Sequence, residues 1–193
     1  MAMDESLVRQ RLLETARLLE ATCARAPEAC AIAEAIVTCY RHGGQLLLCG
    51  NGGSAADAQH IAGEMVGRFL RERAAWPATA LHANTSVLTA IANDYGAEFV
   101  FSRQVEAMGR AGDVLWAIST SGNSRNCVEA MRVAKARGLT VVAMTGEREG
   151  AMAEVADICL RVPASLTPRV QEAQIALAHA VCELVEAALT EEG

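Results

Sequence analysis

The chain has 193 residues, 52% of them hydrophobic, and a formal net charge of −6 at pH 7. This length favours one domain with a sizeable core over two domains, and the sequence has no apolar run near the roughly 20 residues that cross a membrane. The acidic balance argues against non-specific nucleic-acid binding, because no surplus of Lys and Arg is available to displace phosphate counterions. We therefore expect neither a nucleic acid nor a membrane as partner.

The cysteines indicate a reducing compartment. There are seven, scattered singly among apolar residues: Cys23, Cys30, Cys39, Cys49, Cys127, Cys159 and Cys182. An odd number without a C-x-x-C pair favours reduced cysteines that serve as small apolar side chains over a disulfide framework. The first five residues, MAMDE, also lack the character of a secretory signal. We expect a cytoplasmic protein.

Hydrophobic periodicity predicts helices that alternate with short strands. Helices are expected over residues 7–23, 30–40, 55–69, 86–92, 98–108, 125–137 and 168–189. Strands are expected over residues 45–49, 78–81, 113–118, 140–144 and 157–162. Such alternation predicts a five-stranded parallel sheet covered on both faces, a three-layer α/β sandwich. We expect one domain over residues 1–193, in which residues 1–43 form a helical pair that packs on the sheet or on a neighbouring subunit.

A glycine-rich loop, GNGGS at residues 50–54, follows the first predicted strand and opens a helix. Ligands of parallel sheets collect beyond the carboxyl ends of the strands, and glycine lets the backbone approach an anion closely. Gly50, Gly52 and Ala55 also match the dinucleotide fingerprint G-x-G-x-x-A. A dinucleotide site requires an acidic residue after the next strand, where residues 81–84 read LHAN. The nucleotide interpretation is therefore disfavoured.

A second loop, STSGNS at residues 119–124, carries four hydroxyl groups: Ser119, Thr120, Ser121 and Ser124. It follows a predicted buried strand and leads into a helix. Hydroxyls and the N–H groups of a helix N-terminus can bind phosphate without a net positive charge. One serine or threonine would be enough to cap the helix, so this concentration of hydroxyls favours a phosphate site over an ordinary capped turn.

Three side chains suited to proton transfer lie on the predicted helices. His60 and Glu64 are four residues apart and hence on one face, and His179 lies on the final helix, two turns after Gln171. Each has a simpler explanation as well. His60 and Glu64 are compatible with a surface pair, and His179 among alanines is compatible with a core histidine. The residues by themselves leave the question of catalysis open.

Four segments of the chain, taken together and in this order, resemble the phosphoheptose isomerases of the sugar isomerase (SIS) domain proteins: CGNGGSAADAQHIAGE, AIANDYG, GDVLWAISTSGNS and RVQEAQIALAH. The resemblance covers essentially the whole chain. It implies the flavodoxin-like SIS fold and the conversion of sedoheptulose 7-phosphate to D-glycero-D-manno-heptose 7-phosphate for lipopolysaccharide and other surface polysaccharides. It also implies a homotetramer with active sites at subunit interfaces.

The resemblance assigns roles residue by residue. It implies that Glu64 and His179 are catalytic. It implies one zinc ion per subunit, with the ligands His60, Glu64, Gln171 and His179. Substrate contacts are implied for Asn51, Gly52, Gly53, Glu64, Asn93, Asp94, Ser119, Thr120, Ser121, Ser124 and Gln171.

These residue types suit an aldose–ketose isomerisation, in which a proton leaves one carbon and returns to its neighbour through an enediol. We expect Glu64 to act as the carbon base and His179 as the partner acid/base, in an order that stays unassigned. The zinc ligands raise a geometric difficulty. Gln171 and His179 are about 12 Å apart along a helix axis, whereas zinc bonds are only about 2 Å long. Both can be ligands only if both side chains lean inward.

The chain departs from its relatives in the final helix, where Gln174 stands in place of a common histidine and Pro168 in place of an acidic residue of some members. The second departure affects how the sugar hydroxyls are held. Two non-enzymatic alternatives stay open: an adaptor that binds the bacterial replication initiator protein, and a regulator that senses a sugar phosphate. The adaptors lack acid/base residues at the positions of Glu64 and His179. This chain keeps both, which favours the enzyme.

Overall fold

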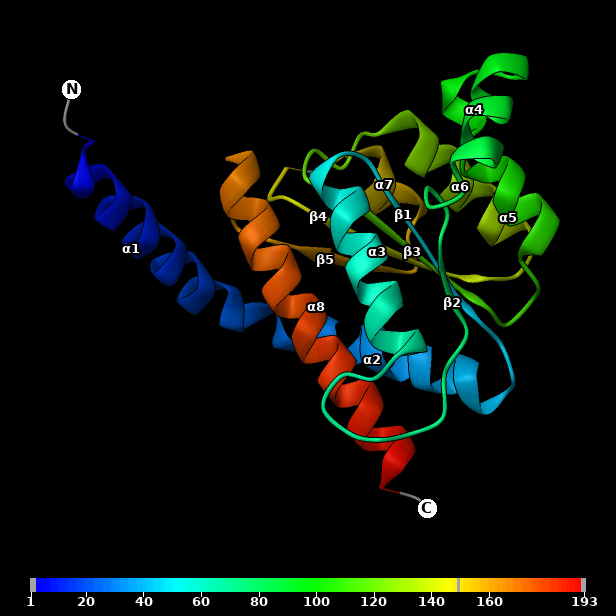
Figure 1. The fold of residues 1–193 in the computed structure, drawn as a ribbon, viewed down its shortest axis with the longest axis horizontal. Helices are drawn as coiled ribbons and strands as arrows, with labels where there is room; N and C mark the ends of the chain where they lie inside the picture. The colour runs from blue at the N-terminus through cyan, green and yellow to red at the C-terminus, as the bar shows by residue number, and fades with distance from the viewer. Residues whose placement is uncertain (1–2, 149, 192–193) are drawn as a thin grey trace.

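A computed structural model describes residues 3–148 and 150–191. Its centre is a five-stranded parallel sheet with the strand order β2-β1-β3-β4-β5 (Figure 1). The strands are β1 (Leu46–Gly50), β2 (Ala78–Ala80), β3 (Val114–Ser119), β4 (Thr140–Thr145) and β5 (Ile158–Arg161). The register pairs Leu46 with Val114 and Val114 with Thr140. Helices lie on both faces of the sheet, so the predicted α/β sandwich is confirmed.

The helices occupy most of the predicted ranges. They are α1 (Glu5–Thr22), α2 (Ala26–Arg41), α3 (Gly53–Val66), α4 (Thr85–Asp94), α5 (Ser102–Met108), α6 (Arg125–Ala136), α7 (Ala151–Val155) and α8 (Thr167–Thr190), with 3-10 turns η1 (Cys23–Arg25) and η2 (Ala97–Phe99). Helix α3 ends earlier than predicted because Gly67 follows it at the C-cap. The helix predicted over residues 98–108 is divided, since the buried residues Val100 and Phe101 separate η2 from α5. Helix α7 was not predicted, because five residues are too few to show a helical period.

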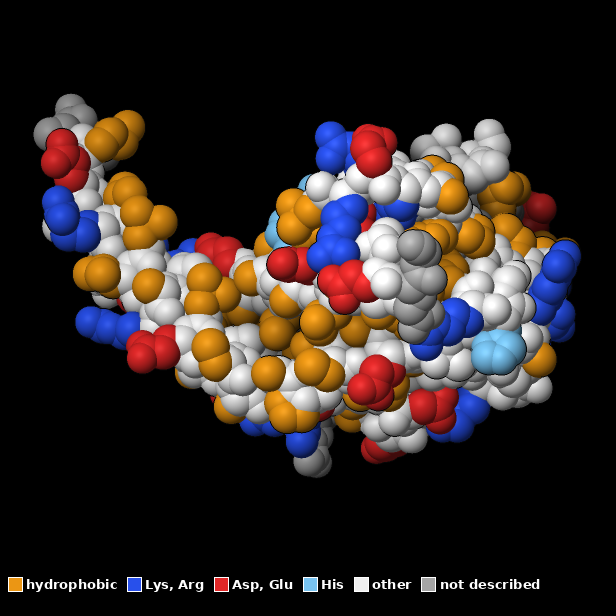
Figure 2. Space-filling model, turned by 90° about the horizontal axis from the view of Figure 1, so that it is seen from below, with side chains coloured by type: hydrophobic (Ala, Val, Ile, Leu, Met, Phe, Trp, Pro, Cys, Tyr) orange, Lys and Arg blue, Asp and Glu red, His pale blue; other side chains and the backbone are white. Residues whose placement is uncertain are grey.

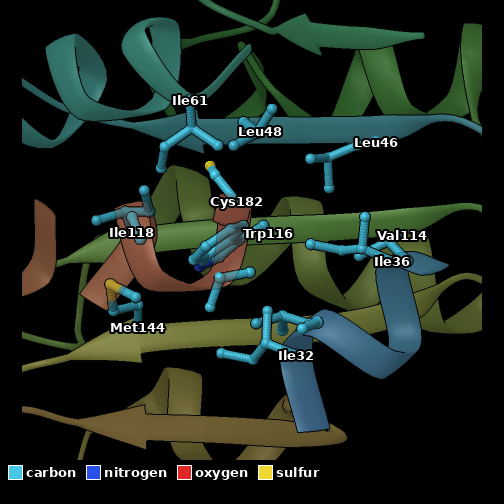
Figure 3. Close-up of a cluster of buried hydrophobic side chains, with 14 of the residues drawn as sticks. Ile32, Ile36, Leu46, Leu48, Ile61, Val114, Trp116, Ile118, Met144 and Cys182 are labelled. Carbon is cyan, nitrogen blue, oxygen red and sulfur yellow. The ribbon is translucent and has the colours of Figure 1, made fainter. Parts of the chain in front are cut away.

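Each face of the sheet buries its own apolar cluster. Leu46 and Leu48 of β1 point to the face covered by α2, α3 and α8, where they pack with Ile36 and Trp116 (Figure 3). Leu47, between them, points to the opposite face beneath α5 and α6. Successive side chains of a strand alternate in this way. A strand covered on both faces therefore reads as the continuous apolar run that the sequence shows at residues 46–49.

The two N-terminal helices differ in their burial. Helix α2 places Ile32 and Ile36 in the core beneath the sheet. Helix α1 extends from the body of the molecule (Figures 1 and 2) and touches it near the start of α8, where the Arg169 guanidinium donates to the Arg11 carbonyl oxygen at 2.6 Å. The rest of α1 exposes leucines, Leu12 being 67% exposed. This helix leaves an apolar surface uncovered.

Among the described residues, α8 is the one helix long and apolar enough to cross a membrane by length and composition. Core helices of soluble proteins share that character. Val170, Val181 and Val185 of α8 are fully buried in the cluster on the sheet. Packing within the fold thus accounts for part of its apolar residues, while Leu184 of the same helix is 42% exposed.

The cysteines of the chain are free, as predicted. Burial raises the pKa of the Cys39 thiol to about 11 and that of Cys182 to about 12, so both are protonated and pack as small apolar groups. Cys23 and Cys30 differ from the prediction because they are exposed on the N-terminal helices.

A buried carboxylate closes the amino-terminal edge of the sheet. Asp113, 2% exposed, precedes β3 and accepts hydrogen bonds from the Gln45 backbone N–H and side-chain amide, each at 3.0 Å. It also accepts from the Arg110 backbone N–H at 2.9 Å. Because Gln45 precedes β1, these bonds fix the two central strands at the edge opposite to their carboxyl ends.

We predict that Asp113→Asn lowers the free energy of unfolding by about 1–3 kcal/mol. The new NH₂ group would face N–H donors from which the carboxylate oxygen now accepts hydrogen bonds. The measurement is chemical denaturation at a fixed protein concentration. Glu106→Gln is the matched control, since it breaks an exposed ion pair with Arg103 and should change stability by less than about 1 kcal/mol. Equal stability of the two variants would contradict the prediction.

Candidate active site

The STSGNS loop brings its hydroxyls together at the carboxyl end of β3. The Ser119 side-chain oxygen lies 2.9 Å from that of Ser124 and 3.3 Å from that of Ser121. Gly122 permits the turn between them by adopting a φ of +67°, a value that L side chains rarely adopt. The Ser124 hydroxyl bonds to Ser119 rather than capping α6. The first turn of α6 therefore keeps N–H groups available for an anion, unlike that of an ordinary capped helix.

The GNGGS loop forms a second helix N-terminus beside the first. Gly52 adopts a φ of +55° at the N-cap of α3 and has no side chain with which to cap the helix. Strands β1 and β3 are neighbours in the sheet, and the chain order reverses between them. In this doubly wound topology such a switch point is where ligands bind. The two predicted loops are thus adjacent at the position that the fold favours for a ligand.

Two asparagines link the loops. The side-chain amides of Asn51 and Asn126 donate to each other's oxygen, both at 2.9 Å. Asn126 also accepts from the backbone N–H of Cys127 in the first turn of α6. Asn51 was predicted from the sequence. Asn126 was not, because its only signal was a polar residue two positions after the hydroxyl-rich loop.

His60, Glu64 and His179 come together from two helices. The Nε2 atoms of His60 on α3 and His179 on α8 are 2.9 Å apart, and His60 Nε2 lies 3.2 Å from Glu64 Oε1. One potential ligand atom of each residue lies within 4.8 Å of the others. Two imidazoles and one carboxylate are ligands that zinc prefers. The donor set fits a divalent metal. His60 and Glu64 do form a pair on one helix, with the imidazole 49% exposed. His179 is only half-buried and joins them, so it is not an isolated core histidine.

A further carboxylate lies one turn before His60. Burial raises the pKa of Asp57, while the positive charge that His60 and His179 can carry opposes the rise. The Asp57 Oδ2 atom is buried and has no hydrogen-bond partner among the described residues. Asp57 was not predicted from the sequence, because an aspartate near the start of a helix is common.

Gln171 packs against the start of α3. Its amide packs against Gly53 so closely that a Cβ atom on this glycine would come within 2.0 Å of Gln171 Nε2. Gly53 is the first residue of α3 and lies seven residues before His60, and Gln171 lies eight residues before His179 on α8. The Gly53–Gln171 contact is therefore about two helical turns before the His60–His179 contact. Gln171 is thus placed at the first loop, and its role as a metal ligand stays a prediction.

Asn93 and Asp94 lie at the end of α4, and their side chains bond to each other at 2.7 Å. Within the part of the chain that the structure describes, no side-chain hydrogen bond joins them to either loop. Helix α4 has no buried residue and lies at the edge of the molecule (Figure 1). These two predicted substrate contacts are therefore not assembled with the others in the single chain.

The departures of the final helix are resolved in part. Gln174 is 1% exposed, and its side-chain amide donates to the Met144 carbonyl oxygen of β4 at 3.1 Å. It belongs to the core rather than to the histidine pair. Pro168 occupies the first turn of α8, where its missing N–H costs nothing.

The chain matches the SIS domain family over residues 13–146. It is similar to the phosphoheptose isomerase of Roseiflexus sp. (strain RS-1), with 54% identity over 96% of this chain and 89% of that protein. A phosphoheptose isomerase structure from Neisseria gonorrhoeae superposes with a TM-score of 0.90 at 43% identity, over 95% of this chain and 98% of that one. A phosphoheptose isomerase structure from Francisella tularensis superposes with a TM-score of 0.92 at 32% identity, over 96% of this chain and 99% of that one. The chain belongs to the SIS domain family and, within it, to the phosphoheptose isomerases.

We predict that Ser119→Ala and Ser124→Ala each weaken the binding of inorganic phosphate by about tenfold or more, because a hydrogen bond to a charged group contributes about 1.5–3 kcal/mol. Titration calorimetry at constant ionic strength measures the affinity. Ser86→Ala, on the exposed part of α4, is the control and should bind phosphate as the unchanged chain does. Unchanged affinity in both loop variants would place the phosphate elsewhere.

Proposed function

We propose that this chain converts sedoheptulose 7-phosphate to D-glycero-D-manno-heptose 7-phosphate in the cytoplasm, for the biosynthesis of surface polysaccharide. The observation that carries the proposal is the meeting of Glu64 with His60 and His179, in a chain that belongs to the phosphoheptose isomerases. Phosphate loops alone would suit a sensor or an adaptor equally well. A carboxylate beside an imidazole supplies the proton transfers that an isomerase needs.

The chemistry divides between the loops and the helices. Ser119, Ser121 and Ser124 hold the phosphate at the switch point, and the helix N-termini favour its negative charge. Glu64 takes the proton from C1 of the ketose and returns it to C2, and a planar enediol lies between the two steps. His179 moves a proton between the two hydroxyl oxygens. The carbonyl thereby shifts from C2 to C1 without any external oxidant or reductant.

The metal of this site is proposed to be zinc, one ion per subunit. His60, Glu64 and His179 would hold it, and Gln171 would join them by leaning toward His179. A bound zinc ion polarises a carbonyl oxygen and stabilises negative charge on it. The chain's own contribution is to fix two imidazoles and a carboxylate within 4.8 Å.

We predict that Glu64→Gln and His179→Gln each lower turnover of sedoheptulose 7-phosphate by about 10²–10⁴-fold, the usual contribution of a positioned acid or base. NMR of the accumulating aldose measures the rate, and calorimetry should show that phosphate binding persists. Glu183→Gln, on the exposed side of α8, is the control and should keep the original rate. Near-normal turnover in either variant would falsify the roles assigned. Ligand binding by the unaltered chain without any conversion would instead support the sensor.

Oligomerisation is proposed from the surface of the N-terminal helices. Leu7, Val8, Leu12 and Leu13 of α1 are between 45% and 67% exposed. An apolar groove of about 230 Å³ runs between α1, α2 and α8, lined in part by Leu19, Leu177 and Leu184. Exposed apolar surface of this kind marks protein contacts. A homotetramer would cover it, and would allow the isolated Asn93 and Asp94 to reach a neighbouring subunit's site.

We predict that Leu12→Asp dissociates the assembly, because a charge on a buried contact is strongly unfavourable. Sedimentation velocity measures the molecular mass against the 20.4 kDa of one chain. Glu5→Gln, at the exposed start of the same helix, is the control and should leave the mass unchanged. A single-chain mass for the unaltered protein would contradict the proposed tetramer.

A further inference from the structure

A buried ion pair joins the loop after α3 to the end of α8. The side chains of Arg73 and Glu186 are 4% and 2% exposed, and Arg73 Nε lies 3.2 Å from Glu186 Oε1. Burying two charges is costly unless other hydrogen bonds satisfy them. The partners of each charge therefore show what the pair holds in place.

Glu186 binds the backbone of the loop. Its carboxylate accepts from the N–H groups of Phe69, Leu70 and Arg71 at 2.9, 2.6 and 2.9 Å. Burial acts to raise the pKa of Glu186, but these three hydrogen bonds and the Arg73 charge outweigh it and lower the pKa. The group is thus a carboxylate that fixes three consecutive peptide units.

Arg73 binds the last turn of α3. Its guanidinium donates to the carbonyl oxygens of Glu64 and Met65 at 2.7 and 2.9 Å. These acceptors belong to the helix end whose carbonyls lack partners within the helix. The guanidinium also lies 3.6 Å from the ring centroid of Trp76, which stacks on Tyr40 of α2. Arg73 is thereby locked to the backbone of Glu64 on one side and to the core on the other.

The loop held by Glu186 reaches the histidine pair. The Phe69 ring packs against the His179 imidazole, with centroids 5.6 Å apart, while His60 lies 5.1 Å from the same imidazole. His179 is therefore flanked by a ring from α3 and a ring from the loop. Both of these neighbours depend on the path of the chain between residues 60 and 73.

We propose that Arg73 and Glu186 are positioning residues, which set Glu64 on α3 and His179 on α8 in the geometry that the reaction requires. The inference rests on the proposed isomerase function for its kinetic consequence. The pair touches neither the substrate loops nor the reacting atoms. Its effect passes through the Glu64 carbonyl group and through the Phe69 ring.

The test compares Glu186→Gln and Phe69→Leu with two controls. Glu186→Gln removes the charge that binds Arg73. Phe69→Leu leaves the ion pair intact and removes the ring against His179, so it tests the contact through which the pair is proposed to act if the first variant fails to fold. Glu191→Gln breaks only the exposed pair with Arg71. Leu139→Ala opens a cavity in the cluster on the opposite face of the sheet and should lower the melting temperature without disturbing α3 or α8.

We expect both test variants to lower kcat by about 10–100-fold while KM stays within about twofold, as is usual when support behind reacting or ligating groups is removed. Affinity for Co²⁺, followed by its visible absorption, should fall by a similar factor. Both controls should keep kcat and Co²⁺ affinity. A merely structural role would predict that Leu139→Ala loses as much kcat as Glu186→Gln.

Three results overturn the inference or separate it from the proposed function. If a test variant folds and keeps its kcat and its Co²⁺ affinity, the proposed positioning role is wrong. An unaltered chain that binds Co²⁺ but does not isomerise the sugar overturns the proposed function, and the Co²⁺ affinities of the variants then decide the positioning role alone. An unaltered chain that neither isomerises the sugar nor binds Co²⁺ overturns both.

Discussion

The close parallel packing of α3 against α8 is the constraint on which the site depends. The two helices run side by side in the same direction over one face of the sheet (Figure 1). Contacts between them recur along their length: Gly53 against Gln171, then His60 against His179, then the loop after α3 against Glu186. A Cβ atom at Gly53 would come within 2.0 Å of Gln171 Nε2, so a larger residue there would require the end of the Gln171 side chain to shift. Groups distant in sequence meet because this register is kept over the whole length.

Binding and catalysis place different demands on the chain. A phosphate needs N–H groups and hydroxyls in a fixed arrangement, and the carboxyl ends of β1 and β3 supply both without a single Lys or Arg in the two loops. This explains how an acidic chain can bind an anion. Proton transfer needs side chains that approach a carbon atom from a defined direction, and helices on one side of the switch point supply those. Loss of the proton-transfer side chains would leave an intact fold that could still bind a sugar phosphate.

Much of the fold could be predicted because its pattern is local. The continuous apolar run at residues 46–49 and the glycines that follow it indicate a buried parallel strand before a phosphate loop. The clustered hydroxyls at residues 119–124 indicate the second loop in the same way. Helix α7 could not be predicted, since five residues show no period, and the break between η2 and α5 depends on tertiary burial of Val100 and Phe101.

The candidate site was only partly predictable, because its assembly depends on long-range packing. His60 and Glu64 could be paired from their helical spacing. Their contact with His179, which lies 119 positions after His60, follows from the register of α3 with α8. From the sequence it could be expected only through the family resemblance. Asn126 had only a weak local signal and Glu186 had none, since their bonds to Asn51 and to Leu70 join positions far apart in the chain. The position of Gln171 against Gly53 likewise depends on that packing.

The buried charges of Asp113, Glu186 and Arg73 lie where two helices or two strands are held in a fixed position relative to each other. Asp113 joins the starts of β1 and β3 through two hydrogen bonds from Gln45, and Glu186 with Arg73 joins α3 to α8. Apolar side chains could fill either location, but apolar contacts are non-directional and tolerate sliding of one element over another. A carboxylate that accepts several N–H bonds has a single favourable position, because displacement leaves buried donors unpaired. The first network joins the strands that carry the two predicted phosphate loops, and the second joins the helices that carry the proposed acid/base groups. By the proposed positioning role, polar contacts outside the site set its geometry.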